Sequence, residues 1–422
     1  MIVKYSINDG AIAIKDGKLV FVGKGTAARG IIADEKIDGR GKVALPGLIN
    51  CHTHVAMTLF RGLAEDKPLD LWLRKTVWPL EAKLTCEDVY AGALLGCLEM
   101  LKSGVTCFSD MYFHEEMVAE AVRKSGLRAV LAEGIIEGGS REFGEKMFDK
   151  SVGFARKFSG AADGRIITML APHAAYSCSP ELLIKVRNKA LELGLGVHTH
   201  VAESVEMFKE IEKRHGCSEV VFLHGLGFFE GHVLAAHCIN LSEIDRRILA
   251  EHGVNVVHVP VANMKLGLGA ARIWDLMRLG VNVALGTDGP ASNNTLDMFE
   301  TVKFAALLQK CICLDPGVLS AYQVLRMATV DGAKALGLDN VVGSLEVGKK
   351  ADIILVDFSK PHLKPLHDVY ASLVYSARGS DVDTVIVDGK ILMQGRQVNT
   401  LYEADVFDKA ERHAADLLAR KP

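Results

Sequence analysis

The 422-residue sequence has no apolar run that approaches the roughly 18 residues of a membrane-spanning helix and no long lysine or arginine block. Met1 leads directly into Ile2-Val3-Lys4-Tyr5, without the basic segment and apolar stretch of a secretory signal. The net charge is only −3. We therefore expect a soluble, cytoplasmic protein that binds neither membranes nor nucleic acid.

The sequence also lacks the cysteine pattern of a disulfide-stabilised or zinc-stabilised fold. Its nine cysteines, an odd number, are scattered from Cys51 to Cys313. In a long chain without a signal peptide, such thiols are expected to be reduced and mostly buried. Cys311 and Cys313 lie close together, but a C-x-C pair without a partner pair makes a poor zinc site.

The two ends of the chain carry similar strand patterns. Asp16-Gly17 near the start and Asp388-Gly389 near the end each separate two apolar runs, which predicts two β-hairpins. Residues 351–357 supply a further strand. We expect three parts: a composite β-sandwich domain from residues 1–48 and 344–400, a central domain from 49–343, and a C-terminal helix from 401–422.

The middle of the chain alternates short apolar runs with helix-like stretches such as 87–102 and 115–125. The run before His52, Lys42-Val43-Ala44-Leu45, brings the number of candidate strands to eight. Eight strands separated by helices over about 250 residues predict a (β/α)8 barrel, an α/β fold. The other seven runs are 105–108, 129–132, 166–170, 196–200, 233–237, 254–258 and 281–286.

Histidine and aspartate stand at the ends of several of these runs. His52 and His54 project to the same side of a strand end, because successive strand side chains alternate between faces. An H-x-H pair alone is weak evidence for a metal. However, the fifth run ends in His200, the sixth ends in His237, and the eighth leads into Asp288. Barrels place active sites at these strand ends, and imidazoles with a carboxylate suit a divalent ion such as zinc.

Other histidines near strand ends have different interpretations. His198 would lie one layer deeper than His200, so we expect a hydrogen-bonded core histidine there. We expect His258 to support structure and His173, at a strand exit, to face a substrate. His114-Glu115-Glu116 matches H-x-E, but the nucleobase-deaminase signature also needs a downstream P-C-x-x-C, which this chain lacks. That zinc-deaminase architecture is excluded.

Several segments resemble the amidohydrolase superfamily: 46–54, 200–203, 237–238 and 287–294. Further segments resemble the 5-methylthioadenosine/S-adenosylhomocysteine deaminases, which include archaeal 5′-deoxyadenosine deaminases. The resemblance covers nearly the whole chain, and its superfamily motifs are more specific than those that separate substrate subfamilies. The further segments are 57–66, 78–81, 110–113 and 263–267.

The resemblance implies a hydrolytic deaminase of adenosine-type nucleosides with one divalent ion held by His52, His54, His200 and Asp288. No lysine stands at the fourth strand exit to bridge a second ion. We expect zinc, with Fe²⁺ and Mn²⁺ as alternatives for the same ligands. Bound zinc can lower the pKa of water to about 7, which provides the hydroxide nucleophile.

The resemblance also implies three catalytic residues. Asp288 would accept the proton of the attacking water. Glu203 would protonate the purine N1 as water attacks C6, and would then help to deliver a proton to the departing ammonia. His237 would steady and orient the hydroxide. The alternative for Glu203 is a solvated carboxylate at the start of a helix.

Substrate contacts follow from the same resemblance. Glu81 resembles the carboxylate that binds the ribose hydroxyls, and a bidentate acceptor suits a vicinal diol. Trp72 would stack on the nucleoside, with an ordinary packed loop aromatic as the alternative. The expected substrate-binding residues are Glu81, Arg141, His173, Glu203, Asp288, Trp72 and Ser292.

One departure from the family bears on specificity. Some relatives carry arginine where this chain reads Leu131-Ala132-Glu133-Gly134. Such an arginine would pair with the amino-acid carboxylate of S-adenosylhomocysteine, whereas Glu133 would repel it by about 1–3 kcal/mol. We therefore expect a preference for adenosines with an uncharged 5′ group, such as 5′-deoxyadenosine or 5′-methylthioadenosine.

Two alternatives remain open at this point. The first is another amidohydrolase, such as a guanine deaminase or a triazine or cyclic-amide hydrolase, for which a ribose-binding Glu81 would have no use. The second is a non-catalytic barrel that serves as a scaffold, which would have no chemical need for the full set of metal and acid–base residues. We also expect a homo-oligomer, with a homotetramer favoured.

Overall fold

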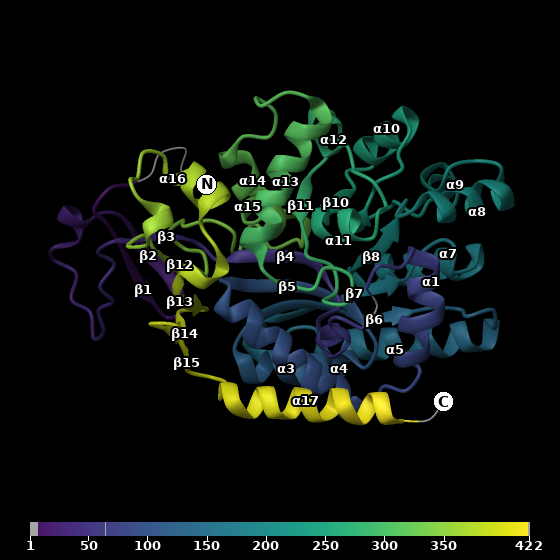
Figure 1. Ribbon diagram of the computed structural model, residues 1–422, viewed down its shortest axis with the longest axis horizontal. Coiled ribbons are helices and arrows are strands. Elements are labelled where there is room, and N and C mark those ends of the chain that lie inside the picture. The colour runs from purple at the N-terminus through teal and green to yellow at the C-terminus, as the bar shows by residue number, and fades with distance from the viewer. Residues whose placement is uncertain (1–6, 64, 421–422) are drawn as a thin grey trace.

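The computed structural model describes residues 7–63 and 65–420, and at its centre eight parallel strands form the expected (β/α)8 barrel (Figure 1). The strands follow one another around the barrel in chain order, from β4 to β11. They are β4 (Leu48–Thr53), β5 (Val105–Tyr112), β6 (Arg128–Ile135), β7 (Ile166–Pro172), β8 (Gly196–Val201), β9 (Val233–His237), β10 (Asn255–His258) and β11 (Val283–Leu285).

Hydrogen bonds that include a side chain close the barrel between its first and last strands. Just beyond β11, the Thr287 backbone N–H donates to Asn50 Oδ1 at 3.0 Å, and Asn50 Nδ2 donates to Thr287 Oγ1 at 2.7 Å. The backbone N–H of Asp288 donates to the carbonyl oxygen of His52 at 2.9 Å. This seam therefore fixes two of the residues predicted to bind the metal against each other.

Helices between the strands cover the outside of the barrel (Figure 1). Many start at a serine or threonine N-cap, such as Thr85, Ser179 and Ser242, whose side chain accepts a backbone N–H of the first turn. Both helices predicted at 87–102 and 115–125 are confirmed. The main helices are α3 (Cys86–Lys102), α4 (Glu115–Ser125), α5 (Arg141–Phe158), α7 (Pro180–Leu193), α8 (Val205–His215), α9 (Glu219–Gly225), α10 (Glu243–Glu251), α11 (Pro260–Lys265), α12 (Ile273–Arg278), α13 (Met298–Cys313), α14 (Ala321–Met327) and α15 (Val330–Ala335).

The chain ends form two further sheets, as expected for a β-sandwich. Both predicted hairpins are present, and Asp16, Gly17, Asp388 and Gly389 all have the positive φ that tight hairpin turns require. Buried Leu19, Ile353 and Ile386 join the sheets in one apolar cluster. One sheet pairs β1 (Gly10–Lys15) with β2 (Lys18–Lys24), and the other contains β3 (Lys42–Pro46), β12 (Ile353–Asp357), β13 (Val382–Val387), β14 (Lys390–Gln394) and β15 (Gln397–Val398).

The run Lys42-Val43-Ala44-Leu45 is not a barrel strand, which corrects one prediction. It forms most of β3, which pairs antiparallel with β12 in the five-stranded sheet, and β4 begins only at Leu48. At Gly47 the chain passes from the five-stranded sheet into the barrel. A Cβ atom at this position would lie 2.0 Å from Thr106 Oγ1, so the close passage of the chain requires glycine.

A buried ion pair ties the amino-terminal end of the barrel to the sandwich. Arg128, the first residue of β6, donates to both carboxylate oxygens of Asp352, at 2.9 and 3.1 Å. Asp352 also accepts the backbone N–H of Asp388 at 2.8 Å. Both members of the pair are 2% exposed, so the joint is dry.

The last helix, α17 (Glu403–Ala419), lies against α3 at the edge of the barrel (Figure 1). His413 Nδ1 donates to Asp88 Oδ1 at 2.8 Å, and Arg420 binds the same carboxylate. Of the predicted C-terminal segment, residues 421 and 422 lie outside the described part of the chain. The exact domain boundaries stay a prediction.

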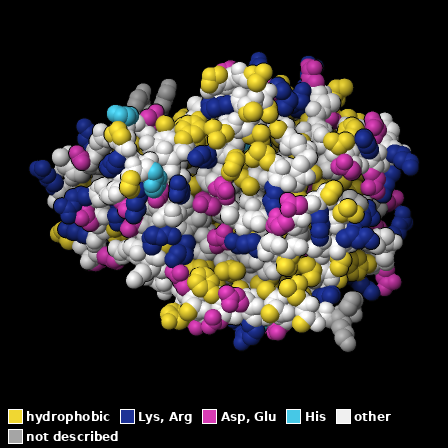
Figure 2. All heavy atoms as spheres, viewed as in Figure 1, with side chains coloured by type: hydrophobic (Ala, Val, Ile, Leu, Met, Phe, Trp, Pro, Cys, Tyr) yellow, Lys and Arg dark blue, Asp and Glu magenta, His cyan; other side chains and the backbone are white. Residues whose placement is uncertain are grey.

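The charged side chains and the cysteines are distributed as the composition predicts. Within residues 7–63 and 65–420, no helix combines the length and apolarity needed to cross a bilayer. On the face shown in Figure 2, basic and acidic side chains are interspersed. All nine cysteines are free thiols, and five of them are buried.

Candidate metal centre and substrate pocket

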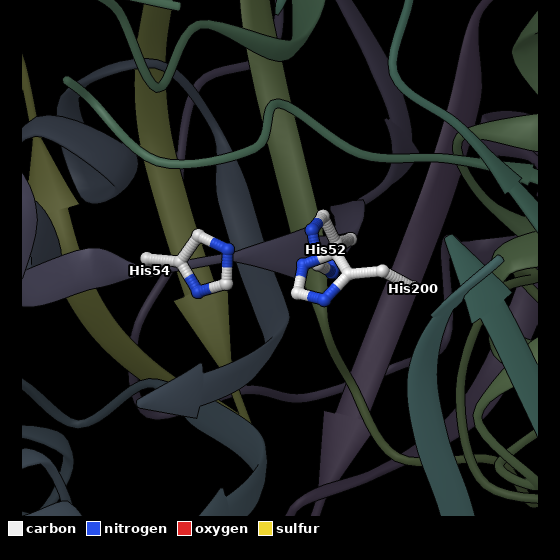
Figure 3. Close-up of side chains that lie close together, drawn as sticks. All are labelled: His52, His54 and His200. Atoms are coloured by element: carbon white, nitrogen blue, oxygen red, sulfur yellow. The ribbon is translucent and has the colours of Figure 1, made fainter. Parts of the chain in front are cut away.

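Three histidines from two strands converge at the carboxyl end of the barrel (Figure 3). His52 and His54 come from the end of β4 and His200 from β8, and one ring nitrogen of each lies within 4.8 Å of the other two. His54 Nδ1 donates to the Met111 carbonyl oxygen at 2.7 Å, and His200 Nδ1 donates to the His173 carbonyl oxygen at 2.8 Å. These bonds hold both rings with Nε2 available as a ligand.

His52 is held by another imidazole instead of a backbone carbonyl. Its Nδ1 lies 2.9 Å from His198 Nε2, and His198 Nδ1 lies 3.3 Å from Ser109 Oγ. All three side chains are fully buried. His198 is therefore the hydrogen-bonded core histidine that the sequence predicts, and its contact leaves His52 Nε2 directed elsewhere.

Asp288 lies beside the three histidines. Its Oδ1 lies 3.6 Å from His52 Nε2 and 3.4 Å from His54 Nε2. Burial disfavours the ionised carboxylate, but the imidazoles of His52, His54 and His237 beside it hold the pKa of Asp288 well below its usual range. His52 Nε2 is buried and has no hydrogen-bond partner among the described residues. An unpaired buried nitrogen beside other ligand atoms fits a divalent cation.

His237 and Glu203 lie beside this cluster. His237 Nε2 is 3.7 Å from Glu203 Oε1, and His237 Nδ1 is 2.9 Å from Asn263 Oδ1. Because an amide oxygen only accepts, Asn263 fixes the proton of His237 on Nδ1 and leaves Nε2 free to accept. Burial raises the pKa of Glu203. The sequence predicts no role for Asn263, although residues 263–267 belong to the segments that resemble the family.

The backbone at the strand exits is unusual in the same region. Ala202, His237 and Asp288 have φ values of 52°, 73° and 66°, which residues other than glycine rarely adopt. The carboxylate of Glu219 accepts the backbone N–H of Ala202 at 2.8 Å and supports the turn that leads to Glu203. Such backbone angles are typical of residues held in place for function.

A pocket opens next to the cluster, covered by residues 69–81. This cover consists of α1 (Leu69–Trp72), η3 (Leu73–Val77) and α2 (Trp78–Glu81). The structure brings most of the predicted substrate contacts to the pocket wall, and burial raises the pKa of Glu81 there. The predicted residues that line the pocket are His54, Trp72, Glu81, His173, His200, Glu203, His237, Asp288 and Ser292.

Arg141 is not brought to this pocket. Its side chain is 81% exposed at the start of α5 and lies 3.7 Å from Glu181. His52 does not line the pocket either, because it is buried behind the cluster. Two tyrosines that sequence reasoning missed, Tyr112 and Tyr176, line the pocket with buried hydroxyls that lack partners within the described part of the chain.

The predicted repulsive role of Glu133 is wrong. Its carboxylate faces the start of α4, where it accepts the backbone N–H groups of His114 at 3.2 Å and Glu115 at 2.9 Å. Lys150 Nζ neutralises it at 2.6 Å. The neighbouring Gly134 lines the pocket instead, because side chains alternate along β6. A paired carboxylate outside the pocket cannot select against a charged substrate.

Comparison with known proteins decides the family. The model of the amidohydrolase family matches residues 43–392, which covers most of the chain. The chain belongs to the amidohydrolase family. A 5′-deoxyadenosine deaminase of Methanosarcina mazei is 51% identical over 414 residues, which is 98% of this amidohydrolase and 95% of that relative.

Two further proteins bear on the chemistry of this amidohydrolase. A 5-methylthioadenosine/S-adenosylhomocysteine deaminase of Desulforudis audaxviator is 50% identical over 410 residues, covering 97% of this chain and 95% of the other. An adenosine deaminase from Xanthomonas campestris, solved with bound zinc, superposes with a TM-score of 0.94 at 34% identity. That superposition covers 98% of this chain and 95% of the other.

Proposed function

We propose that this amidohydrolase is a metal-dependent hydrolytic deaminase of adenosine-type nucleosides, including 5′-deoxyadenosine, 5′-methylthioadenosine, S-adenosylhomocysteine and adenosine. The products are the corresponding inosine derivatives and ammonia. The observation that carries the proposal is a single pocket whose wall holds Glu203 and Glu81 together with His54 and His200 of the histidine cluster. The two relatives described as deaminases of such nucleosides, each about half identical over nearly the whole chain, support it.

One divalent ion, zinc by preference, would be held by His52, His54, His200 and Asp288. Fe²⁺ and Mn²⁺ suit the same donors. A bound ion of this kind makes hydroxide available near neutral pH. The convergence of the three imidazoles and the unpaired Nε2 of His52 support this assignment, as does the zinc in the structure from Xanthomonas campestris.

The protein side chains would move the protons. Water would add its oxygen to C6 of the purine, and the proton that the water loses would pass through Asp288 to the exocyclic nitrogen. The C6–N bond would then break and ammonia leave, while the C6 hydroxyl returns a proton to Glu203. Glu203, whose pKa is raised by burial, would donate a proton to N1. Asp288, whose lowered pKa keeps it ionised, would accept the proton that the attacking water loses. His237, with Nε2 free, would accept a hydrogen bond from that water and orient it.

Glu81 and Trp72 would hold the nucleoside. Glu81 lines the pocket, and the two oxygens of a carboxylate suit the two hydroxyls of a ribose. Trp72 is 5% exposed and lies in the pocket wall, where its ring would pack on the substrate. His173, which follows β7, and Ser292, which lies beyond β11, would complete the contacts with the nucleoside. A role for Arg141 would require its side chain to turn inward.

The preference for an uncharged 5′ group now rests on a different observation. Among the described residues that line the pocket, none is lysine or arginine. A carboxylate on the 5′ substituent would therefore lose water without gaining a cationic partner there. The kcat/KM values for 5′-deoxyadenosine, 5′-methylthioadenosine and S-adenosylhomocysteine test this preference, and a clear preference for the last would contradict it.

One substitution separates the proposal from its rival within the family. Glu81→Ala should cripple the turnover of nucleosides, measured as loss of adenine absorbance, because the ribose loses its acceptor. It should spare a substrate that consists of a base alone. Equal losses for adenosine and for a base-only substrate, or turnover of guanine or a triazine in preference to every adenosine, would favour the rival activity.

Assembly and location remain predictions. We propose a homo-oligomer, with a homotetramer favoured, that acts in the cytoplasm on a small-molecule nucleoside. The relatives that support the activity do not bear on the oligomeric state. Light scattering coupled to size exclusion tests the tetramer, and a monomer at micromolar concentration would contradict it.

A further inference from the structure

A second group of potential metal ligands lies outside the pocket. Cys86 opens α3, His114 precedes α4, and Glu116 lies in the first turn of α4. One ligand atom of each lies within 4.8 Å of the other two. None of the three lines the substrate pocket, although their neighbour Phe113 does. The proposed deaminase chemistry uses none of them.

We propose that Cys86, His114 and Glu116 form a second metal site, which binds a divalent cation of the zinc class with water as the remaining ligand. Cys86 Sγ lies 3.4 Å from His114 Nδ1, and the same nitrogen lies 3.9 Å from Glu116 Oε1. In a tetrahedral zinc site, a sulfur and a nitrogen ligand are about 3.6 Å apart and a nitrogen and an oxygen ligand about 3.4 Å apart. The two separations in the structure differ from these values by about 0.2 and about 0.5 Å.

The backbone around His114 is held in the position that the site needs. His114 has φ 56° and ψ 42°, the left-handed conformation that is uncommon for residues other than glycine. The carboxylate of Glu133 accepts the N–H of His114 and that of the next residue, and Lys150 pairs with that carboxylate. Glu133 thus supports the turn at His114, whose ring nitrogen lies beside Cys86.

The charge of the group also suits a cation. A thiolate from Cys86 and the carboxylate of Glu116 would together neutralise a divalent ion, and the proton of the thiol would leave to solvent on binding. The side chains of His114 and Glu116 are each 31% exposed, so an ion can enter from solvent.

Cobalt titration of the zinc-loaded protein tests the site, because the first metal centre contains no thiolate. With one zinc already bound per chain, we expect one further Co²⁺ to bind and to produce a thiolate-to-cobalt charge-transfer absorption. Cys86→Ser should abolish that absorption, and Glu116→Gln should weaken Co²⁺ binding by at least about 10-fold. The matched control is Cys311→Ser, which removes an exposed thiol elsewhere and should leave the absorption unchanged.

Two results would overturn the proposal. One is the absence of a second Co²⁺ in the zinc-loaded wild-type chain. The other is a charge-transfer absorption that survives in Cys86→Ser, which would assign the thiolate to another cysteine. Circular dichroism of each variant shows whether it is folded, and Glu116→Gln keeps the test decisive if Cys86→Ser fails to fold.

Discussion

The two ends of the barrel treat buried polar groups in opposite ways. At the amino-terminal end, Arg128 and Asp352 satisfy each other with two hydrogen bonds. At the carboxyl end, His52 Nε2 and His237 Nε2 are buried without partners in the described part of the chain. A buried polar atom without a hydrogen-bond partner lowers the stability of the fold. Several such atoms close together are therefore best explained by a ligand that binds them.

Left-handed backbone angles mark residues beside the ligand cluster, although Ala162 and Asp163, before β7 at the other end of the barrel, adopt them too. Left-handed angles occur at the carboxyl ends of strands in Ala202, His237 and Asp288. At the amino-terminal end, the chain enters β4 through Gly47, where only a residue without a Cβ atom fits. Residues held in strained conformations cost about 1–3 kcal/mol each. The amino-terminal end therefore serves stability and the carboxyl end serves chemistry, as is usual for barrels of this type.

The comparison predicts that removing an acid–base group at the carboxyl end costs activity but not stability. Glu203→Gln should lower kcat/KM for 5′-deoxyadenosine by about 10²–10⁴, because the purine N1 loses its proton donor. The melting temperature should stay equal or rise, since a buried ionisable group is removed. Activity within a few-fold of wild type would exclude Glu203 as the acid.

The converse is expected at the amino-terminal end. Asp352→Ala leaves the Arg128 guanidinium buried without a partner and should lower the free energy of unfolding by about 3–5 kcal/mol. The kcat/KM per folded molecule should not change. Denaturant titration measures the loss, and Glu120→Ala, which breaks the exposed pair with Arg123, is the control with an expected cost below about 1 kcal/mol.

Glu219 is expected to affect both stability and the active site, because it is a buried carboxyl that supports the turn before Glu203. Burial raises its pKa from 4.5 to about 7. Between these values the unfolded chain loses a proton that the folded chain retains, so stability should fall as the pH rises from about 4.5 to 7, by up to about 3 kcal/mol. Glu219→Gln should flatten that part of the profile of unfolding free energy against pH. An unchanged slope would contradict the assignment.

The smallest effect is expected for His198, which contacts the first metal centre only through His52. His198→Ala should weaken metal affinity about 10–100-fold, because the His52 ring loses its orienting partner. His198→Gln, which can still hydrogen-bond to His52, should recover part of the loss. Competition with a chelator measures both variants, and wild-type affinity in His198→Ala would show that His52 needs no such support.

The sequence predicted those features that depend on periodicity and position along the chain. The strand exits and the two hairpins follow from apolar runs and what comes after them. The runs also place His52, His54, His200 and Asp288 near strand ends, whereas their assignment as one ligand set follows from the family resemblance and stays a prediction. The first strand was misassigned because Lys42-Val43-Ala44-Leu45 and β4 are separated by only two residues, 46 and 47. An apolar run alone does not say which of two sheets a strand joins.

The errors in the pocket arose from side-chain direction. Glu133 was expected to meet the substrate, but alternation along β6 turns it to the helix layer and presents Gly134 instead. Arg141 lies at the start of a helix after a loop, where spacing gives no orientation. The contacts of Asn263 and Glu219 join elements far apart in sequence, and no local pattern reports such contacts.

Ammonia release from 5′-deoxyadenosine before and after removal of the metal tests the central claim most directly. The account predicts one ammonia for each inosine-type product, loss of both after chelation, and recovery of both when zinc is restored. Nucleoside consumption without ammonia, or full activity in the chelated protein, would contradict it.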